Sequence, residues 1–174
     1  MTRKFLLLVV LLYSIRAMAG WIDGNGAPVA DSAERKSSGE FGVYLAVTAD
    51  PKAFVDAWGR PGKPNLRSAK TVKRGSSVSA VLLFSGCKAN SDGRCQVDVK
   101  YRLISPDGSS QDVGTYPVTR RAAPKPRIIE LGDAIAQFDF ERTDAPGTYR
   151  IVAIVTDQYG KRTLEVSTDV VAVE

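Results

Sequence analysis

Apolar and polar residues alternate along much of the chain, and this alternation predicts β-strands. In residues 96–103 every second position is apolar and most positions between carry charge. Residues 134–140 repeat the pattern, with Phe138 and Phe140 on the apolar side. Similar stretches predict further strands at 41–49, 78–84, 111–118, 149–156 and 163–173.

Two of these stretches depart from simple alternation. Residues 78–84 are apolar at nearly every position, which predicts a strand covered on both faces. In residues 163–173 the apolar positions change phase between Val166 and Val171, which predicts a bulge or bend near Asp169.

One short helix is expected after the first strand. Asp50 offers a side-chain acceptor for the helix start, and Pro51 already has a helical φ angle. Phe54 and Trp58 then follow at helical spacing, and a Gly- and Pro-rich stretch at 59–62 ends the pattern. We expect Trp58 to cap the core under this helix; the alternative is an exposed platform for stacking on a sugar.

Seven or eight strands separated by turns every 8–12 residues are typical of an antiparallel sandwich or barrel. The stretch 144–151 (DAPGTYRI) resembles the corner before the penultimate strand of bacterial immunoglobulin-like and fibronectin-type-III-like modules. This resemblance implies that the Tyr149 hydroxyl bonds back to the loop backbone. Ile151 stands where antibody domains place their second core cysteine. We therefore expect an all-β fold, a single immunoglobulin-like antiparallel β-sandwich of 7–8 strands over residues 40–174.

The first 19 residues have the pattern of a cleavable signal peptide. Arg3 and Lys4 precede an apolar run from Phe5 to Tyr13, and Ala17-Met18-Ala19 supplies small residues for cleavage. Such a run is too short to span a bilayer, so no transmembrane segment is expected in the mature chain. We expect a periplasmic or secreted protein with a flexible N-terminal segment at 20–39.

Cys87 and Cys95 are the chain's two cysteines. They flank an Asn-Ser-Asp-Gly turn, so they are expected to face each other near a hairpin tip and to pair in an oxidising compartment. The alternative is a redox or metal-binding pair, but the spacing is not CxxC and two ligands alone do not make a zinc site. No metal or cofactor is expected.

The charge of the chain depends strongly on the leader. The chain has 24 Lys+Arg against 19 Asp+Glu, and three of the cations (Arg3, Lys4 and Arg16) lie in the leader, which leaves 21 against 19. This small excess argues against a nucleic-acid partner. A second small basic group comprises Lys70, Lys73 and Arg74.

A proline-punctuated crossing carries the most concentrated charge, from the residues Arg120, Arg121, Lys125 and Arg127. It could hold an anionic envelope polymer, a lipid head group or an acidic protein, or it could be an ordinary solvated loop. Trp21, in a polar segment and with no obvious core neighbour in sequence, is a further interaction candidate.

Catalysis is disfavoured because the chain has no histidine, which excludes serine or cysteine nucleophiles paired with imidazole. A hydrolase would need paired carboxylates, and the candidates Asp98, Asp139 and Glu141 fall on polar strand faces. The leading hypothesis is an exported non-catalytic binding or structural module that recognises a protein or envelope component through its loops. The alternatives are a carbohydrate-binding accessory protein and a carboxylate-dependent hydrolase.

Overall fold

The computed structural model describes residues 21–22, 25–61 and 68–174. The expected leader at 1–19 lies outside these residues. Along the described chain the elements are β1 (Arg35–Ser38), β2 (Phe41–Thr48), α1 (Pro51–Trp58), β3 (Thr71–Lys73), β4 (Ser76–Ser85), β5 (Val97–Ile104), β6 (Ser110–Thr119), β7 (Glu130–Phe140), β8 (Gly147–Asp157) and β9 (Arg162–Val173).

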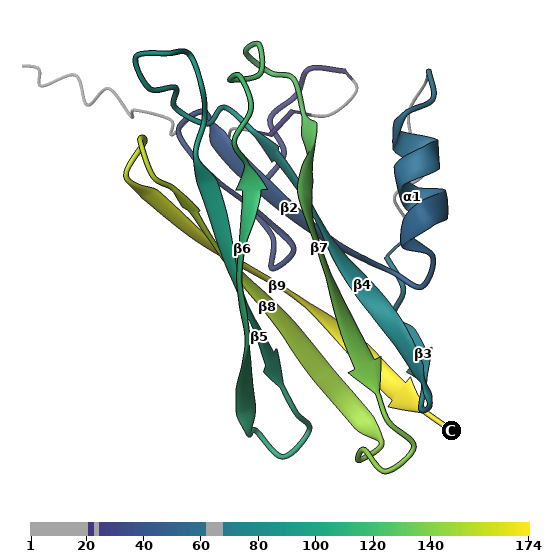
Figure 1. Cartoon of the computed structure of the whole chain (residues 1–174). Helices are drawn as coiled ribbons and strands as arrows, with labels where there is room; N and C mark the ends of the chain where they lie inside the picture. Colours follow the sequence, from purple (N-terminus) through teal and green to yellow (C-terminus); the bar gives the residue numbers. More distant parts are fainter. Residues whose placement is uncertain (1–20, 23–24, 62–67) are drawn as a thin grey trace, which may run out of the picture.

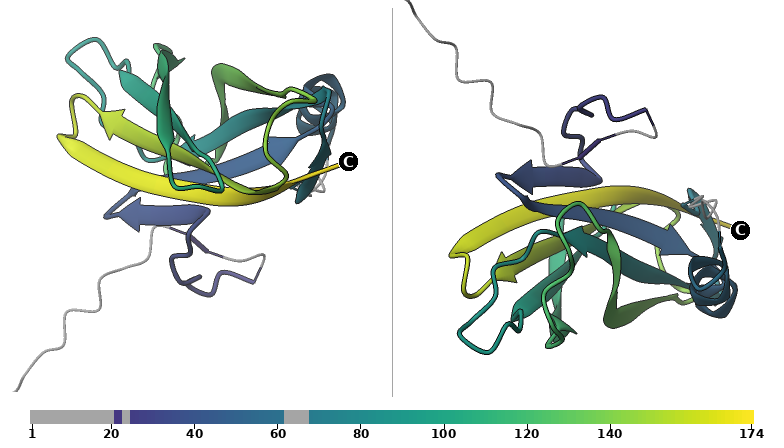
Figure 2. Two further views of the ribbon diagram at one scale, coloured as in Figure 1. Left: turned by 90° about the horizontal axis from the view of Figure 1, so that it is seen from below. Right: turned by 90° about the horizontal axis from the view of Figure 1, so that it is seen from above.

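The strands form two sheets packed face to face, as Figures 1 and 2 show. One sheet has the order β1-β2-β4-β7 and the other β3-β9-β8-β5-β6. The central strands β2-β4-β7 and β9-β8-β5-β6 have the arrangement of an immunoglobulin-like sandwich. This confirms the predicted fold class. The described residues contain two short strands, β1 and β3, that lie outside the strand ranges predicted from the sequence. Strand β3 pairs parallel with β9.

The main core lies between the sheets and follows the predicted alternation. Its largest fully buried side chains include Tyr101, Phe41, Phe84 and Phe140. In β7 the apolar side chains point inward from Ala134 to Phe140 and the residues between them are exposed. Alternate burial therefore orients β7 as the sequence predicted.

Strand β4 is buried on both faces, as expected for residues 78–84. Its inner residues join the main core, while Val81 and Leu83 face outward into a second apolar cluster. Phe54 of α1 completes that cluster, and Trp58 packs against it half-buried. Trp58 therefore does cover apolar residues under the helix, but on the outer face of the sheet. Helix α1 has 8 residues, and no helix in the described ranges is long and apolar enough to cross a bilayer.

The predicted bulge near Asp169 is wrong. Strand β9 pairs with β8 without a register shift along its length, because Thr168 occupies an inward position that the apolar pattern did not reveal. Val170 and Ala172 continue the inward series, whereas Val171 points out and is 38% exposed. A buried threonine thus interrupted the apolar pattern without interrupting the strand.

Tyr149 forms the contact that the resemblance implied. Its hydroxyl donates a hydrogen bond to the carbonyl oxygen of Ala145 at 2.8 Å, closing the corner before β8. Its ring also meets Phe140 edge to face, with centroids 5.0 Å apart. Tyr149 therefore holds the loop backbone through its hydroxyl and packs its ring into the core at the start of β8.

The expectation of a flexible segment at 20–39 is wrong for several of its residues. Residues 35–38 form β1, which pairs antiparallel with β2. Trp21 is buried, at 6% exposure, and its indole nitrogen donates to the carbonyl of Lys36 at 3.0 Å. It packs over Gly42, where a Cβ would lie 2.9 Å from the indole ring. Trp21 therefore docks the N-terminal segment on the outer face of the sheet.

Candidate functional site: the basic end of the sandwich

Three loops, residues 86–96, 120–129 and 158–161, meet at the end of the sandwich that is uppermost in Figure 1. The β1–β2 turn, which carries Glu40, lies beside them against Gly86. Backbone hydrogen bonds connect the three loops. Cys95 donates to Arg121 and Ala123 donates to Gly93, both at 2.9 Å. The N–H of Gln158 donates to Gln96, also at 2.9 Å. We call these three loops together the basic end.

The disulfide predicted from the sequence is present and shapes the first loop. Cys87 and Cys95 are bonded across eight positions of sequence, and both are buried at the edge of the core. Within the loop the Asn90 side chain accepts from the N–H groups of Asp92 and Arg94 at 3.0 and 2.9 Å. The turn chemistry of Asn and the cross-link therefore give this loop a defined shape.

The basic end is strongly asymmetric in charge. Its loops carry seven cationic side chains and one carboxylate, Asp92. The loops at the opposite end, residues 49–50, 74–75, 105–109 and 141–146, carry two cations and four carboxylates. The described part of the chain is thus polarised along its strands, and a positive potential is expected at one end.

Three of the seven cations hold the loops together. Arg94 donates from Nε and Nη2 to the carbonyl of Arg120 at 3.0 and 2.8 Å. Arg120 donates to the carbonyl of Val97 at 2.8 Å and pairs with Asp98. Arg121 pairs with Asp133 at 2.8 Å. Because their donors are directed at these acceptors, Arg94, Arg120 and Arg121 have a structural role.

The other four cations project into solvent without a carboxylate partner among the described residues. They are Lys88, Lys125, Arg127 and Lys161, and all four are exposed. The structure therefore divides the predicted basic crossing: Arg120 and Arg121 are held, whereas Lys125 and Arg127 remain available to a partner.

Large apolar side chains are exposed among these available cations. Ile128 is 49% exposed, Ile129 40% and Tyr159 39%. The turn that presents the isoleucines is closed by the N–H of Ile128 donating to Lys125 at 3.0 Å. The basic end therefore offers mixed cationic and apolar contact on two turns at one end of the sandwich.

A shallow hollow of about 310 Å³ adjoins the crossing loop. It is lined by Trp58, Arg121, Ile129, Glu130, Leu131, Gly132 and Asp133. Its floor is apolar and its wall is the Arg121–Asp133 ion pair. The hollow extends the mixed surface toward the end of α1.

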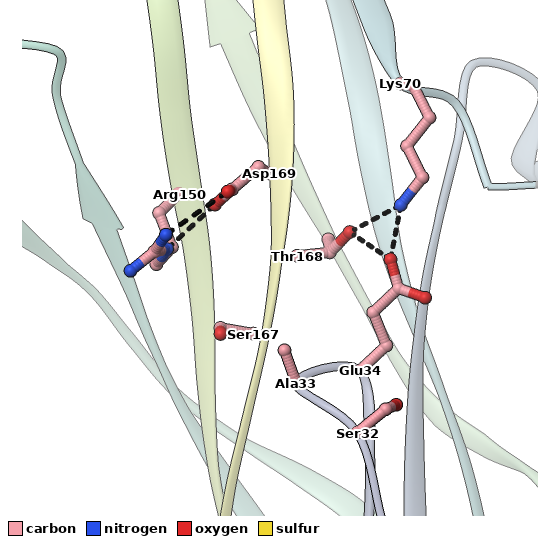
Figure 3. A pocket seen from close by; sticks show the side chains of 8 residues that line it. All are labelled: Ser32, Ala33, Glu34, Lys70, Arg150, Ser167, Thr168 and Asp169. Carbon is pink, nitrogen blue, oxygen red and sulfur yellow. Dashed lines mark hydrogen bonds and ion pairs between the residues drawn. The ribbon is translucent and has the colours of Figure 1, made fainter.

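A second hollow, of about 380 Å³, lies where the N-terminal segment meets β9 (Figure 3). Lys70 and Thr168 both donate to the carboxylate of Glu34, and Arg150 pairs with Asp169 at 2.8 Å. Burial raises the pKa of Glu34, but the hydrogen bonds from Lys70 and Thr168 outweigh this effect and lower it overall. The charged groups in this hollow are thus mutually paired across the seam.

The carboxylates considered for catalysis do not converge. Asp98 lies in β5 beside the basic end, where it pairs with Arg120 and accepts a hydrogen bond from the Gln158 side chain at 3.0 Å. Asp139 and Glu141 lie at the other end of the sandwich, where both are exposed. The topology therefore separates Asp98 from the other two by the length of a strand.

The aromatic residues considered for sugar binding do not form a platform either. Trp21 is buried on one part of the outer sheet face and Trp58 packs under α1 on another. The ring pairs within the described residues involve core side chains only: Tyr101, Tyr116, Phe138, Phe140 and Tyr149. In the part of the chain that the structure describes, no three Cys, Asp or Glu side chains are grouped to hold a metal ion.

No family model and no curated protein matches the chain. Solved structures resemble it at low identity. The CARDB domain of a Pyrococcus furiosus protein, solved with di-metal ions, has 11% identity and a TM-score of 0.42 over 83% of this chain and 98% of that domain. An immunoglobulin-like protein from Pseudomonas aeruginosa has 15% identity and a TM-score of 0.33 over 75% of this chain and 91% of its own.

A third solved structure, an alkylpurine DNA glycosylase from Pseudomonas fluorescens, has 11% identity and a TM-score of 0.42 over 78% of this chain, which spans only 31% of that enzyme. Likeness at these levels carries no activity to the present chain. The chain's own sheet order and tyrosine corner define it as an immunoglobulin-like β-sandwich.

The sequence pattern indicates the crossing loop but not most of the basic end. Lys88 and Lys161 lie far from the crossing in sequence, and only the strand topology brings them to it. The sequence nevertheless contains a usable signal. In an antiparallel sandwich every second loop along the chain lies at the same end, so the charges of the loops at each end can be added up from the predicted strands alone.

Proposed function

We propose that this protein is an exported, non-catalytic binding module that engages an anionic partner through the basic end. The observation that carries the proposal is the segregation of charge, with seven cations and one carboxylate in three adjoining loops. Four of those cations are exposed and have no carboxylate partner in the described chain. Complementary charge steers association and fixes orientation at such a surface.

The structure supports a preformed surface. The disulfide Cys87–Cys95 constrains one loop, and Arg94 and Arg120 fasten it to the crossing. Loops fixed in this way lose little conformational freedom when a partner binds. A disulfide and an immunoglobulin-like fold are also compatible with an extracellular protein.

The test is retention of the full chain on a column of immobilised heparin, used as a generic polyanion. Replacing Lys125, Arg127 and Lys161 with glutamine removes three exposed cations at the basic end. We expect this variant to elute at much lower salt than the wild type, because each lost contact reduces the release of counterions.

The matched control is a triple replacement of Lys52, Lys73 and Arg142 with glutamine, which makes the same charge change in and beside the opposite loops. The control should elute close to the wild type. An equal shift in both variants would mean that net charge alone governs retention, and a wild type that is not retained would refute the proposed function.

A further inference from the structure

The proposed function does not specify which kind of anionic partner binds. The exposed apolar side chains of the basic end favour a partner that has an apolar surface as well as negative charge. A soluble polyanion would neutralise the cations but would leave Ile128, Ile129 and Tyr159 in water. An anionic bilayer surface offers both kinds of contact, since phosphate groups lie directly above acyl chains. We propose that the basic end docks on an anionic phospholipid bilayer, with these three side chains entering the interface.

The placement of the apolar residues supports this occupant. Ile128 and Ile129 lie on the crossing, whereas Tyr159 lies on the β8–β9 turn, and all three are at the same end of the sandwich. Lys125 and Arg127 both precede the isoleucines in sequence, Arg127 directly, and Glu130 follows them. Long basic side chains can extend toward phosphate while their methylene stems and the isoleucines lie deeper.

The backbone of the crossing also suits a membrane interface. Pro124 and Pro126 have no N–H group, so this turn brings fewer hydrogen-bond donors toward a poorly hydrated region. The N–H of Ile128 is already satisfied by the carbonyl of Lys125. The turn can therefore approach the acyl region with few unpaired backbone donors.

An acidic protein is the competing occupant, since the hollow beside Trp58 could receive a side chain. The membrane is favoured because the available cations, Ile128 and Tyr159 lie on separate turns outside that hollow, and of the exposed apolar side chains only Ile129 lines it. A fluid surface can adjust its head groups to such a spacing, whereas a protein must match it with a fixed complementary shape.

The experiment measures co-sedimentation of the full chain with vesicles of phosphatidylcholine alone and of phosphatidylcholine mixed with phosphatidylglycerol. One variant, Ile128→Ser with Ile129→Ser, keeps every charge and removes the apolar contact. A second, Lys125→Gln with Arg127→Gln, keeps the isoleucines. The control is Lys52→Gln with Lys73→Gln at the opposite end. All variants share one N-terminus, so a difference in binding between them reports the substituted residues.

We expect binding to the mixed vesicles only, weakened by salt. Each basic-end variant should bind at least ~10-fold more weakly, and the control should bind like the wild type. Thermal unfolding of each variant verifies that it is folded. Equal binding by the Ile128→Ser/Ile129→Ser variant would overturn the proposal, because charge alone would then explain the interaction.

The outcomes separate this inference from the function on which it rests. Retention on heparin without binding to mixed vesicles would overturn the membrane proposal and leave the anionic-partner function standing. Binding to an acidic protein through the Trp58 hollow, without vesicle binding, would have the same consequence. Failure to bind either heparin or vesicles would remove both proposals.

Discussion

The buried carboxylate of Asp157 accepts a hydrogen bond from the backbone N–H of Lys88, with Oδ2 and N 2.9 Å apart. Its other oxygen accepts from the N–H of Gly160 at 3.1 Å. One side chain thus joins the disulfide loop to the β8–β9 turn. A Cβ at position 160 would lie 2.1 Å from Asp157 Oδ2, so only glycine permits this approach.

Replacing Asp157 with alanine should lower the free energy of unfolding by about 1–3 kcal/mol, because two backbone donors lose their buried acceptor. It should also weaken heparin retention, since the loops of the basic end would no longer be held in register. Urea unfolding and the heparin column measure the two effects. Unchanged stability would show that water replaces the carboxylate without cost, and would contradict the role assigned to Asp157.

Two buried tyrosines should respond oppositely to loss of the hydroxyl. Tyr149→Phe removes the bond to Ala145 and should cost about 1 kcal/mol of stability. The Tyr101 hydroxyl is fully buried and has no hydrogen-bond partner within the described structure, and burial raises its pKa. Tyr101→Phe should therefore stabilise the fold by on the order of 1 kcal/mol. Urea titration of both variants measures the change in the free energy of unfolding. Destabilisation by Tyr101→Phe would contradict the prediction and would indicate a bridging water at that site.

Docking of the N-terminal segment should depend on the absence of a side chain at position 42. Gly42→Ala places a methyl group against the indole of Trp21 and should displace it, exposing residues 25–38 to proteolysis. In a Trp21→Ala background the same substitution should cost little more, because the clash is gone. Similar costs of Gly42→Ala in both backgrounds would contradict this account of the contact.

Glu34 should make the seam between the N-terminal segment and β9 sensitive to acid. Its pKa in the folded chain lies below the ordinary value of 4.5, so its ion pair stabilises the fold above that pH. The stability is lost as the pH falls through the lowered pKa. Glu34→Gln should thus be less stable than the wild type at neutral pH, and the difference should shrink in acid. Urea titrations across pH measure this difference; a constant difference would mean that the carboxylate charge contributes nothing.

The sequence predicted the sandwich well because each of its main strands has a local pattern of apolar and polar residues. The alternation in β5 and β7 and the continuous apolar run in β4 record which faces are buried. The pattern failed where a polar residue was buried, as at Thr168, or where a strand was as short as β3. In both cases the placement depends on neighbours that are distant in sequence.

The same limitation applies to the basic end. Arg120 and Lys125 are alike in sequence, yet one is fixed by Asp98 and the other has no carboxylate partner in the described chain. Trp21 looked available because its contact with Gly42 crosses between separate segments. The sequence shows where the cations lie along the chain. Only the tertiary structure distinguishes the cations that bond to other parts of the protein from those that remain available to a partner.

Hydrogen–deuterium exchange of the full chain, with and without anionic vesicles or heparin, tests the central claim most directly. The account predicts slower exchange in peptides covering 86–96, 120–129 and 158–161, with the loops at 105–109 and 141–146 unchanged. Protection at those opposite loops, or none at the basic end under conditions in which the chain is bound, would contradict it.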